Sequence, residues 1–133
     1  MKKEVSDSNE IPPQDIVERT FLFAVRIVQL CGHLDERRGV GRIMMSQILR
    51  AGSRVPSNVE EADAAQSKAD FISKMSIALK EARETHLRLR LLRSACVVPE
   101  NKLKPLIQEA DEVRRILGAI IVSTKRGGAS NNF

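Results

Sequence analysis

The arginines are the residues whose type and spacing point most directly to chemistry, and they fall into two groups. The first group lies in a stretch without any acidic residue: Arg37, Arg38, Arg42, Arg50 and Arg54. The second group includes one histidine and recurs at spacings of three and four, on one face of a predicted helix: Arg83, His86, Arg90 and Arg93. A guanidinium group binds a phosphate through two parallel hydrogen bonds, so both groups are candidate contacts for the backbone of RNA or DNA.

The same arginines also fit a structural interpretation, in which they form a solvated face or pair with carboxylates of a neighbouring subunit. No aromatic side chains are interleaved with them, because the chain has four Phe, no Trp and no Tyr. Base stacking needs exposed rings, so any nucleic-acid binding is expected to be directed at the backbone and weakly sequence-specific. The formal net charge of +5 is modest and leaves both interpretations open.

Candidate catalytic and metal-binding groups are sparse. His33 and His86 lie in different segments without the Glu-x-x-His spacing of bundle metal sites, so we expect them to be solvated or capping side chains. The acidic run of Glu60, Glu61 and Asp63 is read as a solvated helix flank or a polar network rather than a divalent-cation site. With no nucleophile–base pair in view, we expect no enzyme activity, metal, cofactor or small-molecule substrate.

The composition also bears on where the protein works. Cys31 and Cys96 lie far apart among apolar neighbours, so we expect core residues rather than a disulfide. No apolar run reaches the roughly 18 residues of a membrane-spanning helix, and the first residues lack the apolar segment of a signal peptide. These features predict a cytoplasmic protein without membrane contact.

Apolar residues recur with helical periodicity and predict an all-α protein with four helices, at residues 15–31, 41–65, 67–96 and 99–125. The links between them are short, which makes successive helices antiparallel and predicts an up-down-up-down four-helix bundle. We expect the bundle domain to span residues 14–126, between a flexible N-terminal arm at 1–13 and a flexible C-terminal tail at 127–133.

The first predicted helix has more apolar surface than packing within one bundle requires. One apolar row suffices for such packing, and here a second row and its flanks supply candidate contacts between identical copies: Phe21, Leu22, Val25 and Val28. Asp15 is placed to cap the start of this helix, and Gly32 to take the left-handed turn at its end. The surplus apolar face predicts a homo-oligomer.

The second predicted helix contains Pro56, which leaves two interpretations. In one, a single helix is kinked at Pro56, and Gly52 relieves the crowding of the proline ring against the preceding turn. In the other, the helix breaks, and Ser57 with Glu60 forms a capping box for a new helix. The apolar stripe runs without interruption across the proline, which favours the kinked helix.

The third predicted helix has the clearest pattern. Ser67 and Asp70 mark its start in the manner of a capping box, and apolar side chains then alternate at spacings of four and three. Asp70 with Lys74, and Glu84 with Arg88, have the i, i+4 spacing of favourable ion pairs along one helix.

Residues 47–92 combine two features: the second predicted helix with its Pro56, and the run Ile77-Ala78-Leu79-Lys80-Glu81-Ala82-Arg83-Glu84-Thr85. Further residues of the same pattern are Gln47, Arg50, Ala51, Ser53, Val55-Pro56-Ser57-Asn58, Glu61, Ser67, Asp70 and Phe71. With these residues the chain resembles a bacterial family known simply as four helix bundle proteins. Some members of that family are encoded in intervening sequences of large-subunit ribosomal RNA genes. The chain departs from the usual pattern at His86-Leu87, where an aromatic pair is common, and at Ala62, where Gly is common.

The resemblance implies an antiparallel bundle that assembles into a ring, typically a homopentamer, with a kinked second helix. The family is also similar to the accessory protein of diversity-generating retroelements, a basic pentameric barrel that binds a reverse transcriptase and nucleic acid. We therefore expect a non-enzymatic homo-oligomer that binds RNA or DNA as an accessory factor, with a nucleic-acid-processing protein such as a reverse transcriptase as a candidate partner. The alternative is a protein–protein interaction scaffold. Arg50 and Glu84 are expected to form buried or interfacial ion pairs, and their spacing leaves open whether they meet each other.

Overall fold

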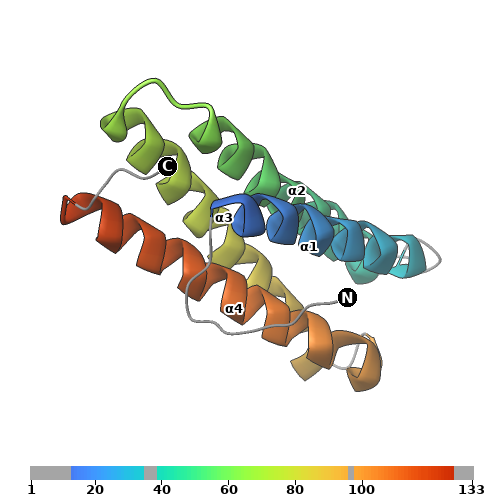
Figure 1. The fold of residues 1–133 in the computed structure, drawn as a ribbon. Coiled ribbons are helices and arrows are strands. Elements are labelled where there is room, and N and C mark those ends of the chain that lie inside the picture. The colour runs from blue at the N-terminus through green and yellow to red at the C-terminus, as the bar shows by residue number, and fades with distance from the viewer. Residues whose placement is uncertain (1–12, 35–38, 96–97, 128–133) are drawn as a thin grey trace, which may run out of the picture.

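A computed structural model describes residues 13–34, 39–95 and 98–127, and within these ranges every regular element is an α-helix (Figure 1). The four helices are α1 (Pro13–Leu34), α2 (Val40–Asp63), α3 (Lys68–Ser94) and α4 (Glu100–Lys125). The predicted all-α, four-helix fold is thus confirmed. The predicted N-terminal arm and C-terminal tail fall almost entirely outside the described residues, and so do Arg37, Arg38 and Cys96.

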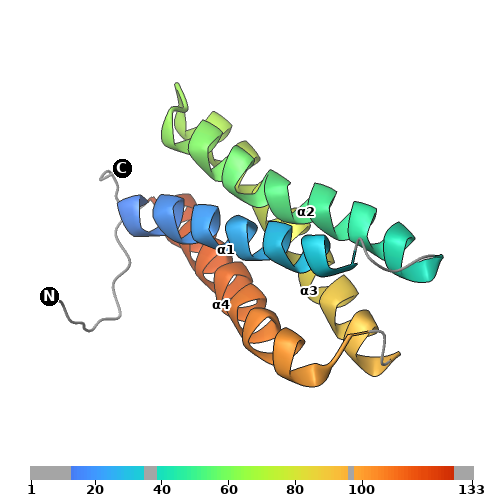
Figure 2. The same cartoon turned by 90° about the vertical axis from the view of Figure 1, so that its right-hand side faces the viewer.

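Each helix packs against the next one along the chain, and α1 also contacts α4, so the four helices enclose one core (Figure 1, Figure 2). The contact between α1 and α4 is the smallest of these. Figure 2 shows why, since the start of α1 lies near the end of α4 and the two helices then diverge. The packing is that of a helix bundle in which α1 lies most closely on α2.

The apolar rows of the sequence become the core. The largest side chains with almost no exposed surface come from all four helices and include Phe23, Ile27, Ile48, Met75, Leu89, Leu92, Leu103 and Leu117. Cys31 is buried as expected, and burial raises the pKa of its thiol to about 11, which keeps it protonated near neutral pH. None of the described helices combines the length and apolar character needed to cross a membrane.

α1 is longer at both ends than the sequence predicts. It begins at Pro13, a favoured residue type in the first turn, so Asp15 lies inside the helix rather than at its cap. It also continues through Gly32 to Leu34, and the glycine with a left-handed φ of 71° is Gly39, just before α2. One glycine costs a helix only about 1 kcal/mol relative to alanine, which the burial of Cys31 and its neighbours outweighs.

α2 is one continuous helix through Pro56, so the alternative with a new helix capped by Ser57 is wrong. Side chains on both sides of the proline are completely or almost completely buried, including Ile48, Val55 and Val59. An interior proline costs about 3 kcal/mol, and a break would expose this stripe. The continuous packing of the stripe therefore maintains the helix.

The start of α3 agrees with its predicted cap. The backbone N–H of Asp70 donates to the Ser67 hydroxyl oxygen at 3.0 Å, and Ser67 itself has an extended backbone. This bond satisfies one of the four N–H groups that a helix start leaves unpaired. The cap therefore fixes where α3 begins after the short link from α2.

Candidate nucleic-acid interface

Polar contacts join α2 to α3 at intervals of seven residues. The three contacts are Lys74 Nζ to Glu61 Oε1 at 3.2 Å, Arg54 Nη1 to Glu81 Oε2 at 3.6 Å, and Arg88 Nη1 to Gln47 Oε1 at 2.8 Å. Each step of seven residues forward along α3 is matched by a step of seven residues back along α2. The interval is that of the heptad repeat in side-by-side helix packing, so the polar ladder follows the edge of the apolar seam.

The ladder corrects the expected pairs along α3. Lys74 and Arg88 are directed toward α2 instead of toward Asp70 and Glu84. The spacing within one helix was therefore a poor guide, because a partner on the adjacent helix was nearer. Sequence spacing alone holds no signal for a contact between two helices until their relative position is known.

Glu81 is the site residue that sequence reasoning missed most clearly. Its side chain is only 9% exposed, and its one ion-pair partner within the described residues is Arg54. Arg54 keeps 56% of its side chain exposed but has this carboxylate beside it, so it is less available to a phosphate than the sequence implied. The one available signal was the position of Glu81, seven residues from both Lys74 and Arg88.

A groove of about 620 Å³ lies along this ladder between α2 and α3. Its charged lining comprises four cations and two carboxylates: Arg50, Arg54, Lys80, Glu81, Glu84 and Arg88. Arg50 and Glu84 both line it, yet the described residues contain no ion pair for either of them. Arg50 and Glu84 therefore form no ion pair within the described residues of one copy, and an ion pair across an interface between copies stays a prediction.

A second cluster lies in the seam between α3 and α4, around the carboxylate of Asp111. Arg114 Nη2 contacts Asp111 Oδ1 at 2.7 Å, and Arg115 Nε donates to Asp111 Oδ2 at 2.9 Å. From α3, His86 Nε2 faces Asp111 Oδ1 at 3.9 Å, and Arg90 Nη1 lies 3.4 Å from His86 Nδ1. Sequence analysis found His86 and Arg90 but not the α4 half of the cluster.

His86 is neither solvated nor a cap, which corrects the expectation from the sequence. Its side chain is 13% exposed, in the α3–α4 seam. Burial, followed by the charges of Arg90 and Arg114, lowers the pKa of His86, although Asp111 acts in the opposite direction. The imidazole is therefore mainly neutral near pH 7.

The pKa of Asp111 is also lowered. Desolvation acts to raise it, but the hydrogen bonds from Arg115 and Arg114 together outweigh that effect. Asp111 is therefore a carboxylate at neutral pH, and it is the negative charge that Arg114 and Arg115 share.

Four of the predicted arginines are exposed and form no ion pair within the described residues: Arg42, Arg50, Arg83 and Arg90. Arg93 is half-buried, and Arg54 is paired with Glu81. The four lie on α2 and α3, which pack against each other, so both sequence groups contribute cations to adjacent helices. Exposed guanidinium groups without a carboxylate partner are free to meet phosphates.

The apolar residues expected on the outside of α1 are indeed exposed. Phe21 and Val28 are each 54% exposed, Leu22 is 50% exposed, and Val25 is 37% exposed. Further exposed apolar side chains include Ile43, Ile77, Leu87, Leu91 and Val122. Solvated apolar area of this kind is available for contact with another protein surface.

One arginine on α1 has a structural role that the sequence did not reveal. Arg19 Nε contacts Glu109 Oε2 at 2.7 Å, and its Nη2 contacts Glu112 Oε1 at 2.6 Å. The hydrogen bond with Glu109 and then the one with Glu112 raise the pKa of Arg19, despite partial desolvation. These two ion pairs join α1 to α4, where the packing contact is small.

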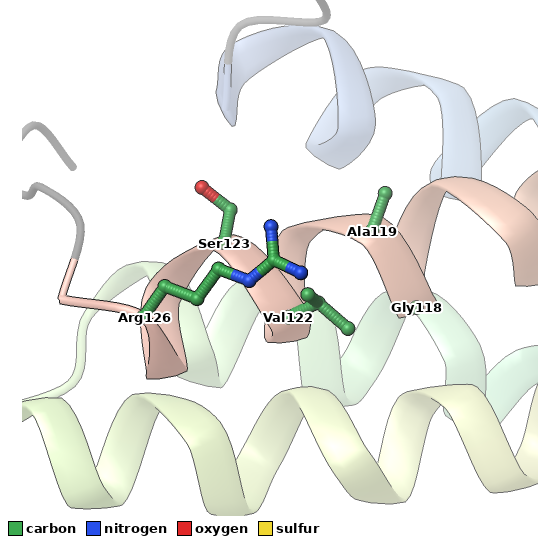
Figure 3. A pocket seen from close by; sticks show the side chains of 5 residues that line it. All are labelled: Gly118, Ala119, Val122, Ser123 and Arg126. Carbon is green, nitrogen blue, oxygen red and sulfur yellow. The ribbon is translucent and has the colours of Figure 1, made fainter.

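An open hollow near the end of α4 is lined by Gly118, Ala119, Val122, Ser123 and Arg126 (Figure 3). Its residues are mostly small, and all of them come from α4 except Arg126, which directly follows the helix. It contains one cation and lacks converging polar groups from a second element. Elsewhere, no three His, Cys, Asp or Glu side chains of the described residues gather as metal ligands, and Glu60, Glu61 and Asp63 are all exposed.

Together these features define a class of protein: an all-α four-helix bundle with unpaired arginines on two adjacent helices and exposed apolar side chains. The family described as 23S rRNA-intervening sequence protein matches residues 13–119, and the chain belongs to this family. Among solved structures, it is similar to a protein of unknown function from the S23 ribosomal protein family of Bacteroides thetaiotaomicron, with 37% sequence identity and a TM-score of 0.76. The match covers 83% of this chain and 97% of the other. No curated protein matches the chain.

Proposed function

We propose that the protein is a non-enzymatic homo-oligomer that binds the backbone of RNA or DNA in the cytoplasm, as an accessory factor. The observation that carries this function is the set of exposed arginines without ion pairs, Arg42 and Arg50 on α2 and Arg83 and Arg90 on α3. Cations left without carboxylates favour a polyanionic partner, since each phosphate they neutralise releases condensed counterions. Among the described residues the exposed aromatic side chain is Phe21, on α1 rather than on the arginine-bearing helices, which favours contact with the backbone rather than with bases.

The proposed assembly is a ring of up-down-up-down bundles with α2 kinked at Pro56, a pentamer in the form that the family resemblance suggests. The opposite order of ladder partners along α2 and α3 supports antiparallel neighbours. The exposed apolar side chains of α1, above all Phe21, Leu22 and Val28, support contact between copies. A ring requires two different faces on each copy, because identical patches meeting each other would stop at a dimer.

Binding is tested with labelled single-stranded RNA and duplex DNA, by fluorescence anisotropy at low salt. The double variant Arg83→Gln/Arg90→Gln should weaken binding by about tenfold or more, because two phosphate contacts are lost. Lys102→Gln/Lys104→Gln is the matched control, since it removes the same charge from exposed positions at the start of α4. No complex with either probe, or equal losses in both variants, would reject the proposed arginine surface.

Self-association is tested by the mass of the particle in solution. A native protein several times heavier than 14.8 kDa is expected. Phe21→Glu should reduce that mass, because it places a charge in the proposed apolar contact. Gln108→Glu adds a charge on the exposed surface of α4 and should leave the mass unchanged. A single 14.8 kDa species in the native protein would rule out the homo-oligomer.

A protein–protein interaction scaffold is the second candidate, and the exposed apolar side chains on α1 and α3 are the observation that favours it. In this function the arginines contact carboxylates of other subunits. Charge reversal at Arg90 and Arg93 separates the two functions. Loss of the oligomer supports the scaffold, whereas an intact oligomer that no longer binds nucleic acid supports the first proposal.

A further inference from the structure

We propose, resting on the nucleic-acid binding proposed above, that the α3–α4 seam holds one phosphodiester group of a bound strand through His86, Arg90, Arg114 and Arg115. The site is more specific than a basic surface, because its members come from two helices. Arg114 and Arg115 contact Asp111 on α4, and His86 of α3 faces the same carboxylate with Arg90 beside it. Its ligand is a phosphate oxyanion, which accepts hydrogen bonds from several donors at once.

The balance of charge in the seam is the first support. Two guanidinium groups, from Arg114 and Arg115, contact the single carboxylate of Asp111, and a third, from Arg90, lies 3.4 Å from the His86 imidazole that faces it. Both contacts between Asp111 and an arginine lie within α4, so they do not join α3 to α4, and one arginine would already balance the charge of the carboxylate. The excess of two positive charges leaves the seam able to attract an anion.

Unused donors are the second support. Arg115 uses its Nε for Asp111 and keeps 69% of its side chain exposed, and no contact within the described residues occupies its two terminal nitrogens. Arg114 Nε is buried and has no hydrogen-bond partner in the described part of the chain. His86 Nε2 is 3.9 Å from Asp111, too far for a hydrogen bond. The seam thus combines the free terminal nitrogens of Arg115 with a nearly buried imidazole, while the unpaired Arg114 Nε lies beneath the surface.

His86 gives the site a dependence on pH. The charged groups that face it are Arg90 from α3 and Asp111, Arg114 and Arg115 from α4, and with burial they lower its pKa. A phosphate bound beside His86 favours the protonated imidazole, so binding and protonation assist each other. Binding therefore tightens as the pH falls from about 7 through the ordinary histidine pKa of about 6.5 and toward the lowered pKa of His86.

Removing the competing carboxylate gives the sharpest test, using labelled single-stranded RNA as the probe. Asp111→Asn should tighten binding by roughly three- to tenfold, since Asp111 repels the phosphate and occupies two of its arginines. Glu112→Gln is the matched control, because it removes the same charge from the next residue, which contacts Arg19 instead. Unchanged or weaker binding by a folded Asp111→Asn protein would overturn the site.

Two further variants keep the test decisive if Asp111→Asn does not fold. Arg115→Gln, at an exposed position, should weaken binding several-fold, whereas Arg126→Gln at the end of α4 should not. His86→Gln should abolish the pH dependence of binding, and His33→Gln, at the only other histidine, should retain it.

The outcomes distinguish the site from the function on which it rests. A native protein that binds neither RNA nor DNA overturns both proposals. Binding that is independent of pH and insensitive to Asp111→Asn and Arg115→Gln overturns the seam alone and leaves the arginine surface of α2 and α3 in place.

Discussion

At the scale of single residues, Gly52 shows how closely α1 lies on α2. A Cβ atom at this position would lie 2.9 Å from Cγ2 of Ile27, a completely buried side chain. Gly52→Ala should therefore destabilise the fold by about 1–2 kcal/mol, because the clash exceeds the gain in helix propensity. Gly118→Ala is the control, since its Cβ would meet nothing within 4 Å, and it should stabilise by about 0.5–1 kcal/mol. Urea unfolding measures the stability of both variants. Equal changes in stability would contradict the close approach of α1 to α2 at Gly52.

His86 carries a second prediction at this scale. Its pKa is lower in the folded protein than in the unfolded chain. As the pH falls below about 6.5, the imidazole of the unfolded chain is therefore protonated before the imidazole of the folded protein. The contribution of neutral His86 to stability is thus complete above that pH. It is lost as the pH falls toward the pKa of His86 in the folded protein. The free energy of unfolding should decline from about pH 7 to about pH 5 in the native protein, and less in His86→Gln. A decline of the same size in both proteins would show that His86 is not responsible.

At the scale of elements, α3 depends on a cap that the sequence already indicated. Ser67→Ala removes the acceptor for the Asp70 N–H and should cost about 1 kcal/mol of stability. Ser73→Ala, at an exposed position inside the same helix, should be neutral or slightly stabilising. Urea unfolding of the two variants decides the matter, and an equal loss in both would mean that the hydrogen bond is unimportant.

The elements also show how far sequence reasoning reaches. Apolar periodicity located all four helices, because burial of one face is the main source of helix stability in proteins. It misplaced the ends of α1, since a single glycine does not outweigh packing on either side of it. It could not find the ladder of Arg54 with Glu81, or Arg114 and Arg115 beside His86, because contacts between helices depend on relative position along their axes. It did predict the exposed apolar side chains of α1, since a second apolar row exceeds what one bundle can bury, but it could not separate exposed arginines such as Arg83 and Arg90 from the half-buried Arg93 and the paired Arg54.

At the scale of the whole molecule, the cations and the apolar side chains divide the surface between two kinds of partner. The exposed arginines of α2 and α3 suit a polyanion, and the exposed side chains of α1, such as Phe21 and Val28, suit a second copy. Assembly would bring the arginines of several copies onto one particle. Repetition of a weak site on one particle raises the overall affinity without any new contact.

The salt dependence of binding tests this account most directly. The affinity for single-stranded RNA and for duplex DNA is measured by fluorescence anisotropy over a range of salt concentrations. With the four unpaired arginines of each copy engaged, the logarithm of the affinity should fall linearly with the logarithm of salt, with a slope of about −3 or steeper. A complex whose affinity is indifferent to salt, or the absence of any complex at low salt, would contradict binding through the phosphate backbone.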